Sequence, residues 1–289
     1  MKGVHSPKAV LFLGVAGVSV SSILVRYSAA PSLVTATYRL GWTVLLLLPM
    51  LLRHRAELKS FAPRDALLCG ASGVLLALHF ATWFESLKHT SVASSTALVS
   101  TEVIFTALGF ALFLKGRIPR AGVWAIAAAF GGSALLACAD GGGGGALYGD
   151  LLALAGAVFV AAYTLIGRVE RARLSTTVYT FFTYLACVLT LLALDLATGT
   201  PVWGYPPAEL LIGLGLAVLC TLLGHSLFSW SLKYLSPSYV SAAKLCEPVF
   251  AAVLAGFLFG EIPGALQLAG AALVVGGVLL YTRTEKETA

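Results

Sequence analysis

The stretch from Ser91 to Leu114 constrains the fold most, because its 24 consecutive residues carry a single charge, Glu102, near the middle. A helix of that length spans the roughly 30 Å hydrocarbon core of a bilayer. A carboxylate at that depth costs about 2.5–3.5 kcal/mol. The sequence therefore predicts a membrane-spanning helix whose acid meets a cation, a proton or a water-filled cavity.

The same stretch occurs a second time, 145 residues further along the chain. Glu102 corresponds to Glu247, and the segment Ser86-Leu87-Lys88 reappears as Ser231-Leu232-Lys233. Shared alanines and leucines are expected by chance, whereas a shared acid and a shared lysine are not. We interpret the pattern as an internal duplication, with a first repeat over 1–138, a Gly-rich linker over 139–147 and a second repeat over 148–289.

The composition indicates a polytopic membrane protein. The chain is 58% hydrophobic and 11% charged, whereas soluble domains are about 25% charged. We therefore predict an all-α fold of ten transmembrane helices, and we interpret the apolar N-terminal run as a retained first helix rather than a signal peptide. The predicted helices cover about 8–26, 33–52, 64–87, 91–114, 120–138, 148–168, 174–197, 208–232, 237–259 and 264–282.

The basic residues predict the orientation of these helices. With a cytoplasmic N-terminus, 15 of the 19 lysines and arginines lie in cytoplasmic loops, and only Arg26 and Lys88 lie outside. Such a bias is typical of multi-pass proteins of the cell (inner) membrane, and it predicts that both termini are cytoplasmic. Because each repeat has five helices, an odd number, the second repeat is expected to be inverted relative to the first.

Several function classes find no support in the sequence. The net charge of +6 follows from the cytoplasmic loops, so no nucleic-acid partner is expected. The five cysteines show no zinc or redox spacing, and no motif predicts a cofactor, a metal site or an enzyme. The glycine run at 141–145 lacks the Lys-Ser/Thr of a phosphate-binding loop, which favours an extracytoplasmic linker.

Candidate site residues are the polar and aromatic side chains within the predicted helices. Glu247 and Lys244 are three residues apart in the ninth helix, so they could pair with each other, which would be a purely structural role. Arg39 and Lys244 are the candidates for ion pairing or coupling. Arg39 lies in the outer third of the second helix, so it could instead extend toward the membrane surface, pair with a helix-end carbonyl or contact the substrate directly. The remaining candidates for substrate binding are His79, Trp83, Glu102, Tyr163, His225 and Trp230; for each of them, packing in the core is the alternative.

The two duplicated segments resemble a known family. Ser91–Pro119 and the run from Cys246-Glu247-Pro248 to Gly260-Glu261 are similar to the two EamA repeats of the drug/metabolite transporter superfamily. One departure is Gly116-Arg117, where the second copy has Gly260-Glu261. The resemblance implies a central cavity between helices 1, 3, 4, 6, 8 and 9. By the same resemblance, that cavity is faced by His79, Trp83, Glu102, Tyr163, His225 and Glu247.

These observations favour a secondary transporter that exports small amphipathic metabolites, amino acids first among them, by alternating access around a midplane cavity. The four intramembrane charges sum to zero, which suits a zwitterionic substrate, and protons are candidate coupled ions. The alternatives are a flippase or carrier of lipids or lipid-linked solutes, drug efflux, and a membrane scaffold or enzyme without transport. The expected partners are therefore a small-molecule substrate and membrane lipids.

Overall fold

The computed structural model describes residues 6–90, 92–139, 146–259 and 264–283, and every regular element in these ranges is a helix. The linker glycines 141–145 and the Gly260-Glu261 pair lie outside the described residues. The elements of the first half are α1 (Pro7–Val18), α2 (Ser21–Tyr27), α3 (Ser32–Arg53), α4 (Arg55–Leu58), α5 (Pro63–His89), α6 (Val92–Val99), α7 (Glu102–Phe113) and α8 (Arg120–Ala139).

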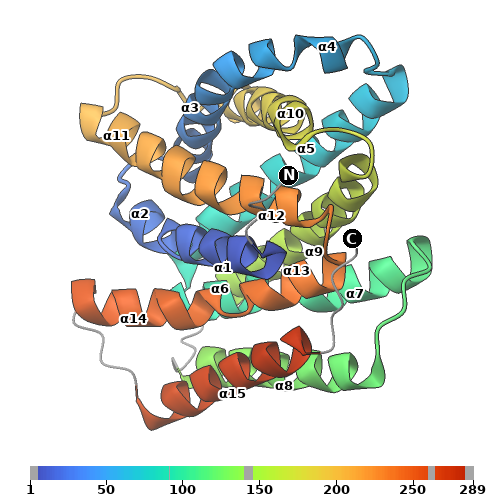
Figure 1. The fold of residues 1–289 in the computed structure, drawn as a ribbon. Coiled ribbons are helices and arrows are strands. Elements are labelled where there is room, and N and C mark those ends of the chain that lie inside the picture. Colours follow the sequence, from blue (N-terminus) through green and yellow to red (C-terminus); the bar gives the residue numbers. More distant parts are fainter. Residues whose placement is uncertain (1–5, 91, 140–145, 260–263, 284–289) are drawn as a thin grey trace.

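The second half of the chain runs from yellow-green to red in Figure 1. Its elements are α9 (Ala146–Arg171), α10 (Thr176–Ala197), α11 (Pro207–Gly215), the π-helix η1 (Leu216–His225), α12 (Ser226–Ser231), α13 (Pro237–Lys244), α14 (Glu247–Phe259) and α15 (Ala265–Thr282). Proline occupies the first turn of several helices, where its missing N–H costs no hydrogen bond. Ser175 and Ser236 cap α10 and α13 by accepting hydrogen bonds from the backbone N–H of Val178 and Tyr239.

Apart from the short helix α4, the described elements group into ten helical segments whose bounds lie within three residues of the predicted ones. Six of these are long and apolar enough to cross a membrane by length and composition, including 7–27, 63–89 and 207–231. Large apolar side chains such as Leu52, Leu112 and Phe257 are well exposed, as expected for a surface that faces lipid rather than water.

Four of the ten segments are not continuous α-helices. The first, fourth and ninth segments are each interrupted by two residues, at 19–20, 100–101 and 245–246, and the eighth contains η1. The interruptions at 100–101 and 245–246 are equivalent in the two repeats, because each directly precedes the duplicated glutamate. Apolar periodicity does not reveal such breaks, because long apolar runs continue on both sides of them.

Packing between the segments repeats when the two halves are exchanged. The segments are numbered 1 to 10 in chain order, so segment 1 of the first half is equivalent to segment 6 of the second. Segment 1 packs against segment 8, and the equivalent segments 6 and 3 also pack together. Likewise, segment 2 packs against segment 8, and the equivalent segments 7 and 3 pack together. Two pairs map onto themselves: α3 with α10, and α8 with α15, which lie side by side along one edge of the bundle (Figure 1). This exchange is the pattern that a two-fold relation between the halves produces.

Candidate functional site

A small cavity lies where the two halves meet. Its volume of about 40 Å³ leaves room for only a few water molecules. Side chains from both repeats line it: Val18, Ser21, Arg39, His79, Trp83, Val99, Ser100, Glu102, Val160, His225, Phe228, Lys244 and Glu247. Four of these residues carry formal charges that balance, two positive and two negative.

Broken helices position three of the four charges. Glu102 is the first residue of α7, Glu247 is the first residue of α14, and Lys244 is the last residue of α13. A carboxylate at a helix N-terminus and a cation at a C-terminus are both stabilised by the unpaired backbone dipoles of those ends. The breaks therefore offset part of the cost of charge within the membrane, and the broken-helix arrangement is typical of substrate sites in carriers.

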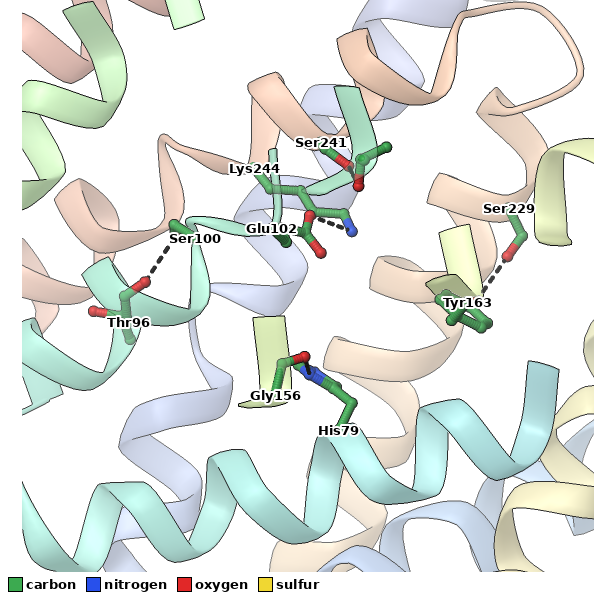
Figure 2. A network of polar contacts seen from close by, with 10 residues as sticks. His79, Thr96, Ser100, Glu102, Gly156, Tyr163, Ser229, Ser241 and Lys244 are labelled. Carbon is green, nitrogen blue, oxygen red and sulfur yellow. Dashed lines mark hydrogen bonds and ion pairs between the residues drawn. The ribbon is translucent and has the colours of Figure 1, made fainter. Parts of the chain in front are cut away.

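Lys244 pairs with Glu102 across the two repeats. Its Nζ lies 2.8 Å from Oε1 of Glu102, and both side chains are over 90% buried (Figure 2). The atoms are at ion-pair distance but poorly aligned, so neither Glu102 oxygen accepts a hydrogen bond from the described residues. The alternative pairing of Lys244 with Glu247 is not observed within the described residues, because the break at 245–246 takes the two side chains out of helical register.

Arg39 is fully buried rather than extended toward the membrane surface, so that expectation was wrong. Its Nε donates to Oγ1 of Thr221 at 2.8 Å, and one terminal nitrogen donates to Oγ of Ser21 at 3.1 Å. The guanidinium also lies 4.2 Å from the ring centroid of Phe80, a cation–π contact. The other terminal nitrogen has no hydrogen-bond partner among the described residues, which leaves it available to an anionic group in the cavity.

The π-helix explains how Thr221 reaches Arg39. Thr221 lies in the middle of η1 and donates a hydrogen bond to the carbonyl of Leu216, five residues earlier, at 3.3 Å. Its hydroxyl oxygen then accepts the hydrogen bond from Arg39. Wide π turns frequently occur at functional sites because they shift side chains out of α-helical register.

Two histidines lie next to each other in the cavity wall. Nδ1 of His79 contacts the carbonyl of Gly156 at 3.0 Å (Figure 2), and because a carbonyl only accepts, Nδ1 carries the proton. The His79 ring stacks on Trp83 with centroids 5.7 Å apart, and His225 lies 6.4 Å from His79. The Nδ1 atom of His225 and the indole nitrogen of Trp83 have no hydrogen-bond partner among the described residues.

Tyr163 and Trp230 do not line the cavity. The Tyr163 hydroxyl lies 3.1 Å from Oγ of Ser229, and its ring contacts the edge of His225 with centroids 6.1 Å apart. Tyr163 therefore packs against His225, which itself lines the cavity. Trp230 is partly exposed and packs on Tyr234, with centroids 4.6 Å apart, so the structure does not bring it to the predicted site.

Sequence reasoning missed several residues that line the cavity. Phe228 was recoverable, because it follows Trp83 at the same 145-residue offset that relates the repeats. Phe228 also lies under the Lys244 ammonium, 5.0 Å from ring centroid to Nζ. Ser21 and Ser100 carried no such signal, because isolated serines in apolar helices are usually packing residues.

The fold and the site together define a class of protein, a multi-pass helical membrane protein with a charged cavity between two similar halves. The model of the EamA-like transporter family matches residues 8–138 and again 147–283. The chain therefore belongs to the EamA-like transporter family. It contains two EamA domains that cover most of its length, and it is a transporter rather than an enzyme.

Individual relatives are more distant. The chain is 28% identical over 221 residues to the pseudopaline exporter CntI of Pseudomonas aeruginosa (strain PAO1), covering 74% of each chain. It is 29% identical over 218 residues to the "probable terminal-alkyne amino-acid exporter" of Streptantibioticus cattleyicolor, covering 75% of this chain and 72% of that protein. A solved crystal structure superposes with a TM-score of 0.73 at 21% identity, covering 96% of this chain and 97% of the other, which shows the shared fold.

Proposed function

We propose that the chain exports small zwitterionic metabolites such as amino acids by alternating access around this cavity. The observation that carries the proposal is the cavity lining, in which two cations and two carboxylates from both repeats lie around one cavity. The relatives that are named as exporters, one of them of an amino acid, support the direction and the substrate class.

The two charged groups of a zwitterion match the charged side chains of the cavity. Its carboxylate has two cations to bind, Arg39 with its free terminal nitrogen and Lys244, while its ammonium has the two glutamates. Binding would replace the single Lys244–Glu102 pair with two pairs to the substrate, so no charge is left buried alone. Trp83 and Phe228 would contact the apolar part of the substrate.

The size and position of the cavity support alternating access. A volume of about 40 Å³ is too small for an amino acid, so we expect the two halves to move apart to admit one. We propose that repeats 1–138 and 148–289 are inverted, that linker 139–147 is extracytoplasmic and that both termini are cytoplasmic in the inner membrane. The asymmetry of the basic residues and the exchange pattern of helix packing support this arrangement.

The test is transport by the purified protein in proteoliposomes loaded with radiolabelled amino acids. We expect efflux that Glu102→Gln and Glu247→Gln each reduce at least tenfold. Glu209→Gln is the matched control, because Glu209 is also buried but accepts hydrogen bonds from Ser28 and the Ala29 N–H far from the cavity. Wild-type rates in both cavity variants at every pH would refute the assignment.

A further inference from the structure

A second pair of buried acids lies away from the cavity, at the end of the bundle that the orientation assigns to the cytoplasm. Asp65 is in the first turn of α5 and Glu170 is in the last turn of α9. Both side chains are fully buried. We call Asp65 and Glu170 the cytoplasmic acid pair.

The two members of the pair have different surroundings. Oδ2 of Asp65 accepts a hydrogen bond from the Ala62 N–H at 2.9 Å, and Oδ1 lies 3.3 Å from the Arg173 guanidinium. Neither oxygen of Glu170 has a hydrogen-bond partner among the described residues. The titratable groups that face Glu170 are Asp65, Arg64 and Cys69 on α5 and Arg173 before α10.

A buried carboxylate without a partner is costly when it is charged, and binding a proton removes that cost. Within the described part of the chain, the one arginine at ion-pair distance from either acid is Arg173, and it pairs with Asp65. A sodium or other metal ion would need several oxygen ligands, whereas Glu170 and Asp65 are only two side chains, and the described residues contain no cluster of three metal-binding side chains. A proton, unlike a metal ion, needs no set of several oxygen ligands.

The position of Glu170 connects it with closure of this end. In the same stretch of α9, Arg168 donates to the carbonyl of Leu232, and Arg171 donates to the carbonyl of Ser229 at 2.9 Å. These bonds tie the end of α9 to the end of α12. Glu170 itself faces α5. If this end of α9 moves away from both α12 and α5, water reaches Glu170, and the ionised carboxylate can then be solvated and pair with Arg64 or Arg173.

We propose that Glu170 is a proton-binding site whose bound proton holds the cytoplasmic end of the transporter closed. The proton binds the closed state better than the open one, so a fall in proton concentration shifts the population toward the open state. The inference goes beyond the proposed function, because it concerns the response of this end to cytoplasmic pH whatever the substrate is.

Cys69 provides a reporter of opening, because it is buried beside the acid pair. In full-length protein whose other four cysteines are replaced by alanine, we compare the rate of maleimide labelling of Cys69 with and without Glu170→Gln, since glutamine mimics the neutral acid. We divide the rate without Glu170→Gln by the rate with it, so that the ionisation of the thiol itself cancels. We expect this ratio to rise by up to about tenfold per pH unit. As the control, the same ratio measured with Glu209→Gln in place of Glu170→Gln should stay constant.

A ratio that stays constant across pH for Glu170→Gln would overturn the proposal. Infrared difference spectra give a second measurement. Wild-type protein and the Glu209→Gln variant should show a protonated carboxyl band that the Glu170→Gln variant lacks, and identical spectra would also overturn the proposal.

If Glu170→Gln does not fold, Arg173→Gln takes its place. It should slow Cys69 labelling at high pH by removing the cation that favours the ionised form of Glu170. No readout uses a substrate, so failure of amino-acid transport would leave this test intact.

Discussion

Lys244 and Glu102 show how a single pair of side chains joins the two repeats. The pair is over 90% buried, and its members come from α13 and α7, on either side of the duplication. In the first repeat, the position equivalent to Lys244 is Val99, so the charges of the cavity are not symmetric even though the packing of the segments repeats. This asymmetry places one cation against two duplicated acids.

We predict strong energetic coupling between Lys244 and Glu102. Lys244→Met or Glu102→Gln alone removes one partner from a buried pair, which costs about 3–5 kcal/mol when the other charge stays buried. The double variant should be less destabilised than the sum of the two, with a coupling energy of about 1–3 kcal/mol. Denaturant unfolding in detergent measures it.

The half-exposed pair of His89 and Glu85, at 3.0 Å, is the control for this cycle. Its coupling energy should be below about 1 kcal/mol, as in other surface pairs. Additive effects of Lys244→Met and Glu102→Gln would mean that the 2.8 Å approach contributes nothing to stability.

Arg39→Lys is predicted to abolish transport although it keeps the charge. A lysine ammonium is a compact point charge, so it cannot reproduce the hydrogen bonds to both Thr221 and Ser21 together with the cation–π contact with Phe80 that the guanidinium makes. Loss of these contacts should lower the free energy of unfolding by about 1–3 kcal/mol. Efflux assays and unfolding curves check both effects, and Arg53→Lys, at an exposed site, should change neither.

At the scale of elements, close helix contacts depend on glycines whose position in the helix matters. A Cβ on Gly73 of α5 would lie 2.4 Å from the backbone carbonyl oxygen of Thr183 on α10, whereas a Cβ on Gly70 of the same helix would meet nothing within 4 Å. The first glycine therefore sets the α5–α10 distance, and the second does not.

We predict that Gly73→Ala destabilises the protein by about 1–3 kcal/mol, because the backbone of α10 must move away. Gly70→Ala should be neutral or slightly stabilising, since alanine favours a helix by about 1 kcal/mol over glycine. Thermal unfolding in detergent distinguishes the two. Equal stabilities of the two variants would show that α5 and α10 do not pack this closely.

For the whole molecule, the proposed inversion places equivalent residues on opposite sides of the membrane. Lys88 and Lys233 occupy the same position in the two repeats. In a cysteine-free variant, Lys88→Cys should react with an impermeant maleimide added to intact cells. Lys233→Cys, at an exposed position, should react only after permeabilisation. Labelling of both from the same side would refute the inverted arrangement.

Much of this architecture could be predicted from the chain alone. Long apolar runs predict membrane helices because the bilayer requires about 20 apolar residues per crossing. The 145-residue offset of Glu102 and Glu247 revealed the duplication, and the resemblance to the EamA repeats indicated the family. Trp230 lies away from the cavity, because helical spacing does not tell which aromatic residues of η1 and α12 face inward once a π-helix alters the register.

The amino-acid order was sufficient for the composition of the membrane segments, their number and the four charges that they enclose, because hydrophobicity and charge are properties of individual residues. The pairing of Lys244 with Glu102, the burial of Arg39 against Thr221 and the isolation of Glu170 were decided only by the packed molecule. The reason is that partners in these contacts are far apart in the chain, and two-residue breaks and a π-helix set their directions.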